Sequence, residues 1–436
     1  MKNVIGVNER PAIGTSIMLS LQHLFAMFGS TVLVPNLLGV DPAICLLMNG
    51  IGTLLYLWIC KGKIPAYLGS SFAFIAPAGA VIGDQAAGGG SYAAALGGFI
   101  AAGVVFTIVA LIVQAAGTSW INVVFPPAAM GAIVAVIGLE LIPVAAKMAG
   151  WIMPDGLTPE EASSWSPDGS IVILSTITLA VTVLGSVLFR GFLRIIPILI
   201  GIVVGYVLAF AMGLTDFTLV GDSGWIQSPT FTAPVFQWAA ILTILPASLV
   251  VIAEHIGHLV VTSNIVEKDL SKEPGLHRSL LGNGISTIIS GFVGSTPNTT
   301  YGENIGVLAI TKVYSTFVIG GAAVLAILLS FSGKFSALIS GIPVPVMGGI
   351  SLLLFGVIAA SGLRMLVESK IDYGRPTNMF LTTVVLVTGL SGVKVTFGDF
   401  SLSGMALATV VAIVLSLLFK VFEVLKLSND TEATKH

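Results

Sequence analysis

The chain has 436 residues, of which 55% are hydrophobic and only 9% are charged, and its formal net charge is -2. Soluble domains carry about 25% charged residues, so this composition excludes a water-soluble protein. Apolar runs of about 20 residues, each long enough to cross the hydrocarbon core of a bilayer, recur along the chain. The sequence therefore predicts an all-α polytopic membrane protein.

The first apolar run follows a polar stretch that ends at Arg10. It has no small-residue cleavage site before Pro35, so we expect it to remain as a membrane span. Cys45 and Cys60 lie in apolar stretches, which predicts packed thiols rather than a disulfide framework or a thiolate metal site. In chain order, the sequence predicts fourteen segments at about residues 13–34, 43–60, 64–82, 91–115, 121–146, 170–189, 193–213, 237–263, 277–293, 299–312, 313–332, 336–361, 377–392 and 402–425.

The connections between these segments differ in charge. Of the 19 basic residues, only Lys147, Lys334 and Lys394 fall in the odd-numbered connections. The even-numbered connections carry Lys61, Lys63, Arg190, Arg194, Lys268, Lys272, Arg278, Arg364, Lys370 and Arg375. Because cytoplasmic loops are enriched in Lys and Arg, this pattern predicts that both termini lie in the cytoplasm.

Two segments do not have the pattern of simple spanning helices. Residues 69–77 and 294–303 are rich in small and polar side chains and are interrupted by Gly or Pro. Such backbone is tolerated at membrane depth only where it lines a cavity or is buried in protein. The two segments are the third and the tenth, which are equivalent positions in two repeats of seven, and paired interruptions of this kind indicate a transporter's binding site.

Shorter fragments also support the repeat. Residues 22–24 resemble residues 254–256, and residues 126–131 resemble residues 343–348, in the same order along the chain. Because seven is an odd number, the second repeat must enter from the opposite side of the membrane. The sequence therefore predicts an inverted repeat.

Glu254 is the first candidate for a functional residue, because it lies within an apolar helix, where an acid costs about 2.5–3.5 kcal/mol. It is predicted either to bind a proton or ligand or to be a structural acid between helices. His258 lies four residues later on the same helix face and could tune it by a hydrogen bond. For His255 a functional and a structural role stay open. The spacing of the two histidines does not match a zinc-protease motif, so no metal site is predicted.

Glu303 follows the second interrupted segment at the predicted start of a half-helix. The helix dipole and the free N–H groups there favour a carboxylate and can also receive a polar ligand. The alternative is a capping acid without a ligand role. Glu140 also lies in an apolar run, near the end of its segment, and is interpreted as structural.

Residues 303–312 resemble the signature of the nucleobase-ascorbate transporter family, also called nucleobase:cation symporters. This signature has an acid, Gln or Pro, then Asn-x-Gly-x-x-x-x-Thr and a basic residue or Gly. Residues 22–29, 61–72 and 253–258 resemble its uracil-transporting bacterial members, and the similarity extends over essentially the whole chain.

The resemblance implies a fold of fourteen segments in two inverted repeats, with short antiparallel strands in segments 3 and 10. Segments 1–4 and 8–11 would form a core domain, at residues 1–118 and 234–333. Segments 5–7 and 12–14 would form a gate domain, at residues 119–233 and 334–436. The ligand would lie between the strand crossing and the gate.

The resemblance also implies the site. Phe72 and Gly302 would contribute backbone N–H groups, and His258 would support Glu254. An apolar site disfavours the charged form of a carboxylate, so we expect Glu254 with His258 to couple transport to protons. Uracil presents N–H donors and C=O acceptors on one planar edge, which carboxylates and backbone amides can satisfy. The residues implied for substrate binding are Glu254, Glu303, Phe72, Gly302, Ser71 and Tyr301.

The implied activity is proton-coupled import of uracil across the bacterial cytoplasmic (inner) membrane by movement of the core against the gate. Homodimerisation through the gate domains is implied as well. We expect no cofactor, no metal ion and no nucleic-acid partner, and sodium coupling stays open. The alternatives are a purine or xanthine carrier, an anion carrier of the related sulfate-transporter fold, and an intramembrane enzyme. Two acids argue against an anion site, and the lack of a Ser/His/Asp set argues against an enzyme.

Overall fold

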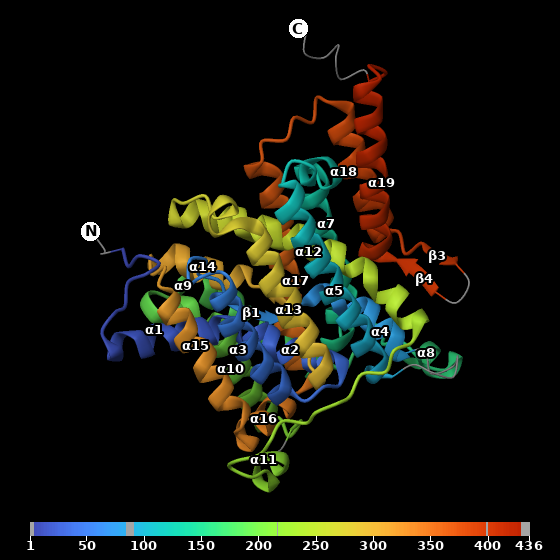
Figure 1. Cartoon of the computed structure of the whole chain (residues 1–436). Coiled ribbons are helices and arrows are strands. Elements are labelled where there is room, and N and C mark those ends of the chain that lie inside the picture. The colour runs from blue at the N-terminus through green and yellow to red at the C-terminus, as the bar shows by residue number, and fades with distance from the viewer. Residues whose placement is uncertain (1–3, 84–90, 216, 398–399, 429–436) are drawn as a thin grey trace.

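The computed structural model describes residues 4–83, 91–215, 217–397 and 400–428, and this part of the chain is mainly helical (Figure 1). The elements before residue 234 are α1 (Ile13–Ala26), α2 (Phe28–Leu38), α3 (Pro42–Ile59), β1 (Leu68–Ser70), α4 (Ile75–Gly83), α5 (Tyr92–Ala116), α6 (Ile121–Val124), α7 (Pro127–Met148), α8 (Pro159–Ser164), α9 (Gly169–Leu188), α10 (Pro197–Ala211) and α11 (Thr218–Asp222). The later elements are α12 (Trp238–Val266), α13 (Leu276–Val293), β2 (Asn298–Thr300), α14 (Gly302–Thr311), α15 (Thr316–Ser330), α16 (Gly333–Ser340), α17 (Val344–Glu368), α18 (Pro376–Leu390), β3 (Lys394–Phe397), β4 (Phe400–Ser403) and α19 (Gly404–Val424).

Within the described residues, eight helices are long and apolar enough to cross a membrane, counting α1 and α2 as one. The pair α15 and α16, bent by 89°, forms a ninth candidate. These helices establish a multi-pass membrane protein, as the composition predicted. The count of fourteen segments stays a prediction, because elements such as α4, α10 and α18 are shorter than the spanning helices.

Two of the predicted segments combine separate helices. The predicted segment 336–361 is wrong at its start, because α16 ends at Ser340 and α17 begins only at Val344. The predicted segment 121–146 is likewise divided between α6 and α7. Both breaks contain proline, at Pro343 and at Pro126, and proline disfavours helical backbone in the residue before it. The β3–β4 hairpin lies in a connection for which no strand was expected.

Several helix starts follow from local sequence. The Asp41 carboxylate accepts a hydrogen bond of 2.9 Å from the N–H of Ala43 at the start of α3, where Pro42 is the first residue. The Ser91 hydroxyl accepts from the N–H of Ala94, at 3.2 Å, at the start of α5. Such side chains satisfy N–H groups that have no partner within the helix. The caps therefore define where these helices enter the apolar region.

The helices pack in two groups. In one group, α15 packs against α1 and α3, and α13 packs against α3 and α5. Helix α5 also packs against α12. In the other group, α7 packs against α17, α18 and α19, and α9 packs against α10 and α17. A Cβ atom at Gly362 would lie only 2.2 Å from the backbone nitrogen of Ala135, so glycine permits the close approach of α17 to α7. The division of the chain into a core and a gate domain stays a prediction.

Glu140 connects two helices of the second group. Its Oε2 accepts a hydrogen bond of 2.9 Å from the N–H of Met405, in the first turn of α19. A Cβ atom at Gly404 would lie 1.7 Å from Oε1 of the same carboxylate, and Gly404 has a φ of 52°, so only glycine fits there. A carboxylate is favoured at a helix N-terminus. The structural interpretation of Glu140 is therefore confirmed.

That both termini lie in the cytoplasm stays a prediction from the distribution of Lys and Arg.

Candidate functional site

The two interrupted segments meet in a two-stranded antiparallel sheet near the centre of the helices (Figure 1). In this sheet Leu68 of β1 lies opposite Thr300 of β2, and Ser70 lies opposite Asn298. The Thr53 side chain of α3 accepts a hydrogen bond of 2.9 Å from the N–H of Leu68 and holds β1 against that helix. The predicted antiparallel strands in segments 3 and 10 are therefore confirmed.

A helix follows each strand. After β1 comes a 3₁₀ turn at Phe72–Phe74 that continues into α4, and after β2 the helix α14 begins at Gly302. The first N–H groups of a helix have no partner within it and carry a partial positive charge. The two helix starts lie at opposite ends of three residue pairs, a length of about 10 Å. They can therefore donate hydrogen bonds to a small polar ligand from two sides.

The structure brings the two predicted acids together. Glu303 is the second residue of α14, and Glu254 lies within the long helix α12. The two carboxylates are close enough to interact electrostatically, and Tyr301 lies near both. Both acids are half-buried rather than sealed in the core. Each of the two side chains therefore keeps some surface that a ligand can contact.

His258 lies at the same place but contacts a different partner from the one expected. Its Nδ1 is hydrogen-bonded to the hydroxyl of Thr300 in β2, at 3.1 Å. A Cβ atom at Gly302 would lie 3.3 Å from its Nε2. Among the described residues, no hydrogen bond joins His258 to Glu254. His258 therefore links α12 to the end of β2 and to the start of α14, and its part in proton coupling stays a prediction.

The structure favours the structural role of the two left open for His255. Its ring is buried, and its Nε2 is hydrogen-bonded to the Ser279 hydroxyl of α13 at 2.7 Å. Ser279 in turn bonds the Tyr56 hydroxyl of α3 at 2.6 Å. The other ring nitrogen lies 3.4 Å from the Thr300 hydroxyl. Because buried polar groups need partners, this network fixes α12, α13 and α3 around the strand crossing.

Tyr301 and Ser71 flank the crossing. The Tyr301 hydroxyl donates a hydrogen bond to the carbonyl of Ser70, so its phenol closes the strand pair. The Ser71 hydroxyl is buried and has no hydrogen-bond partner within the described part of the chain. Contact of either side chain with a ligand stays a prediction. The Ser71 hydroxyl has no partner, so it is better placed than the Tyr301 hydroxyl to form a hydrogen bond with a ligand.

The Tyr301 ring lies directly over Gly69, which leads to a testable prediction. A Cβ atom at Gly69 would lie 1.9 Å from Cε2 of this ring, so Gly69→Ala must displace the ring or the strand. Forcing an extra methyl into a packed site costs about 1–3 kcal/mol. We expect a lower melting temperature in detergent and loss of transport. The matched control is Gly79→Ala in α4, where nothing lies within 4 Å of the added atom. Equal melting temperatures for both variants would contradict the prediction.

Phe72 connects the first helix start to the second group of helices. Its ring packs edge to face against Phe355 of α17, with the ring centroids 5.8 Å apart. Aromatic pairs in this geometry are favourable beyond the area they bury. The helix start that is predicted to donate to the ligand is therefore also a contact between the predicted core and the predicted gate.

Two amide side chains at the site were not identified from the sequence as structural contacts. The Asn304 side chain of α14 donates a hydrogen bond of 2.9 Å to the carbonyl of His23 in α1. The Asn298 side chain of β2 donates to the Ser286 hydroxyl of α13 at 2.6 Å. Amides in apolar segments need hydrogen-bond partners, and this requirement was the available signal. Their partners lie far away in the sequence, so only the fold identifies them.

Membrane-spanning helices, two short helices that start at a central strand crossing, and a pair of acids at that crossing define a membrane transporter. Comparison with known families agrees with this class. The model described as "Permease family" (Xan_ur_permease) matches residues 14–398, and the chain belongs to this family. It is therefore a membrane permease and not an enzyme.

Similar proteins cover almost the full chain. The uracil permease of Paenibacillus larvae is 62% identical over 427 residues, which are 98% of this chain and 99% of that protein. The uracil permease of Escherichia coli K12 is 63% identical over 425 residues, which are 98% of this chain and 96% of that protein. At this identity and coverage, the similarity extends over both interrupted segments.

Solved structures of more distant proteins share the fold. The transmembrane domain of the cyanobacterial bicarbonate transporter BicA has a TM-score of 0.61 at 16% identity, covering 98% of this chain and 99% of that chain. The murine anion transporter Slc26a9 in its inward-facing state has a TM-score of 0.69 at 12% identity, covering 95% of this chain and 69% of that chain. At such identities the similarity concerns the fold alone.

Proposed function

We propose that this permease is a proton-coupled symporter that imports uracil across the bacterial cytoplasmic membrane. The observation that carries the proposal is the pair Glu303 and Glu254 at the strand crossing, in a chain 63% identical to a uracil permease of Escherichia coli. Carboxylate oxygens accept hydrogen bonds from ring N–H groups, and N–H groups at a helix start donate to ring carbonyls. Uracil offers both kinds of group on one edge.

In this proposal Glu303 anchors the ring at the start of α14, and the backbone N–H groups of Phe72 and Gly302 bind its carbonyls. Ser71 and Tyr301 flank these contacts. Glu254 takes part in ligand binding and carries the proton. His258 holds β2 and α14 in place beside Glu254 through its bond to Thr300. A charged acid within a membrane is costly, so a proton that neutralises one carboxylate as the ligand crosses lowers that cost.

The proposed movement is that of the core, residues 1–118 and 234–333, against the gate, residues 119–233 and 334–436. It assumes fourteen segments in two inverted repeats, both termini in the cytoplasm and a homodimer formed through the gate. The contact of Phe72 with Phe355 supports it, because that contact lies beside the helix start that is proposed to hold the ligand. Such a contact must change when the core moves.

Uptake into proteoliposomes tests the proposal. With an acidic exterior we expect labelled uracil to accumulate above its external concentration, and a protonophore should abolish the accumulation. Vesicles with equal pH on both sides are the control for passive binding. Accumulation that follows a sodium gradient and ignores the pH gradient would contradict proton coupling. Competition by excess unlabelled xanthine that equals competition by uracil would favour the purine alternative.

An anion substrate is the less favoured alternative. The solved structures of similar fold include a bicarbonate transporter, but two carboxylates at the crossing would repel an anion. Lys312, the nearest basic residue in the sequence, lies after the last residue of α14, about 13 Å along the helix from Glu303. Uptake of labelled sulfate or bicarbonate that competes with uracil would overturn the proposal.

A further inference from the structure

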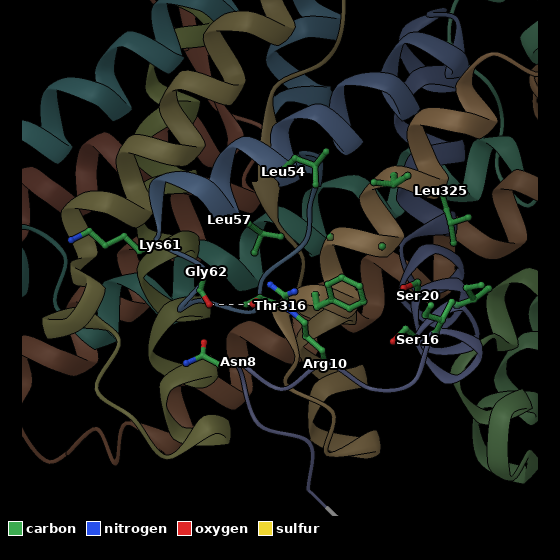
Figure 2. A pocket seen from close by; sticks show the side chains of 16 residues that line it. Asn8, Arg10, Ser16, Ser20, Leu54, Leu57, Lys61, Gly62, Thr316 and Leu325 are labelled. Atoms are coloured by element: carbon green, nitrogen blue, oxygen red, sulfur yellow. Dashed lines mark hydrogen bonds between the residues drawn. The ribbon is translucent and has the colours of Figure 1, made fainter.

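A cavity lies away from the strand crossing, between α1, α3 and α15 (Figure 2). It has a volume of about 740 Å³ and is open toward the outside of the helix bundle. None of the residues proposed for uracil binding lines it. Its volume is within the range of about 300–1,000 Å³ that is typical of ligand sites. The transport mechanism therefore leaves this cavity unexplained.

Small residues produce the hollow. A Cβ atom at Gly321 would lie 2.3 Å from the Ser20 hydroxyl, so α15 approaches α1 closely at this point. At the neighbouring Gly320 a Cβ atom would meet only Leu57 and Leu54, at 3.7 and 3.9 Å. The Ser20 hydroxyl already donates to the carbonyl of Val318, so it needs no hydrogen bond from a ligand. The floor of the groove therefore offers an apolar surface.

The walls of the groove are exposed apolar side chains. Ile13 and Ile17 of α1 are 77% and 50% exposed, and Phe317 of α15 is 47% exposed. Leu54 of α3 and Val324 of α15 continue the walls along the helices. In a bilayer such side chains contact hydrocarbon. A groove with these apolar walls accommodates an acyl chain better than a rigid polar solute.

One end of the groove is basic. The guanidinium of Arg10 lies 5.5 Å from the centroid of the Phe317 ring, at the mouth of the groove (Figure 2). Lys61 lines the same end, with its ammonium turned outward in this view. Within the described residues neither Arg10 nor Lys61 forms an ion pair, whereas the neighbouring Lys63 is paired with Glu273. Arg10 therefore lacks a counter-charge at this end, whereas the charge of Lys61 interacts at longer range with Glu273.

Arg10 is held in this position by the chain that precedes it. The N–H of Ile5 donates to the carbonyl of Lys312 at 3.0 Å, and the N–H of Thr316 donates to the carbonyl of Val7 at 3.0 Å. The Ser315 hydroxyl donates to the carbonyl of Glu9. These bonds fasten residues 5–9 along the start of α15. The basic end of the groove is therefore built by the fold and is not a mobile tail.

We propose that this groove binds an anionic phospholipid from the leaflet that the charge pattern assigns to the cytoplasm. Its phosphate contacts Arg10, with Lys61 adding to the positive potential, and one acyl chain lies between α1, α3 and α15 over Gly320. Anionic headgroups are attracted to basic clusters at the cytoplasmic ends of membrane helices. The unpaired charge at Arg10 selects an anionic lipid over a zwitterionic one, because only the former brings a net negative charge.

Native mass spectrometry of the purified full-length protein, titrated with dioleoylphosphatidylglycerol or dioleoylphosphatidylethanolamine, tests the proposal. We expect the wild type to retain the anionic lipid preferentially. Arg10→Gln should weaken its retention about fivefold, the effect of one basic residue near a membrane surface. Gly320→Leu should remove it, because the new side chain occupies the groove.

Two matched controls accompany these variants. Arg364→Gln removes a basic charge that is already paired with Glu368, and Gly356→Leu adds a side chain where nothing lies within 4 Å. Both should retain the lipid as the wild type does, and uracil binding by all four variants checks that they are folded. Equal retention of both lipids by the wild type, unchanged retention in Gly320→Leu, or an equal loss in the controls would overturn the proposal.

Discussion

Replacing Glu303 by glutamine is expected to weaken uracil binding by about 100-fold and to abolish uptake. Hydrogen bonds to a charged group contribute about 1.5–3 kcal/mol, and a carboxylate can accept two of them from a planar edge. Glutamine has almost the same shape, but its NH₂ group presents donors where the ring also presents donors. The loss therefore measures the charge and the acceptor pattern of Glu303 rather than its volume.

Isothermal titration calorimetry with uracil on the purified variant measures this effect. The matched control is Glu368→Gln, which changes an exposed acid at the end of α17 that is paired with Arg364. The control should bind as the wild type does, and the melting temperature of both variants should stay close to that of the wild type. Retained affinity in Glu303→Gln would return Glu303 to the role of a capping acid at the start of α14.

The second large effect is expected at Glu254. In Glu254→Gln we expect exchange of labelled for unlabelled uracil to continue, with weaker affinity, while accumulation driven by a pH gradient is lost. The reason is that an amide can still accept one hydrogen bond but cannot take up a proton. The two acids thus differ in which step fails, although they lie at the same strand crossing.

Counterflow and gradient-driven uptake in the same proteoliposomes separate the two steps. Counterflow needs binding and movement of the carrier but no net proton transfer, so it serves as the internal control for folding. The Glu368→Gln variant is the external control and should show both activities. Gradient-driven accumulation that persists in Glu254→Gln would assign the proton to another group, and loss of counterflow as well would limit Glu254 to substrate binding.

The sequence indicated the site because charged side chains and interrupted backbone are energetically unfavourable in lipid. A carboxylate within an apolar run, such as Glu254, needs a reason, and backbone interrupted by Gly and Pro must be buried in protein or line a cavity. These two constraints predicted that the interrupted segments and the two acids belong to a binding site. The family resemblance added the antiparallel strands, and the structure confirmed them. The proline breaks before α7 and α17 were visible in the sequence too, but the hydrophobic runs masked them.

The partners of individual side chains were less accessible. Sequence spacing placed His258 on the helix face of Glu254, but its hydrogen bond is to Thr300, a residue 42 positions away. His23 and Asn304 were noticed only as parts of motifs, yet they join α1 to α14 across 281 positions. Spacing within one helix predicts which residues share a face and says nothing about what packs against that face.

The two glutamates separate what the sequence determined from what only the fold determined. The sequence by itself determined that the protein is a membrane protein, that its charges are distributed unequally between its two sides, and that Glu254 and Glu303 are exceptional in an apolar chain. Only the tertiary structure decided that these two acids, 49 residues apart in the printed sequence, interact. The physical reason is that hydropathy is local to each residue, whereas the meeting of α12 and α14 depends on how distant strands and helices pack.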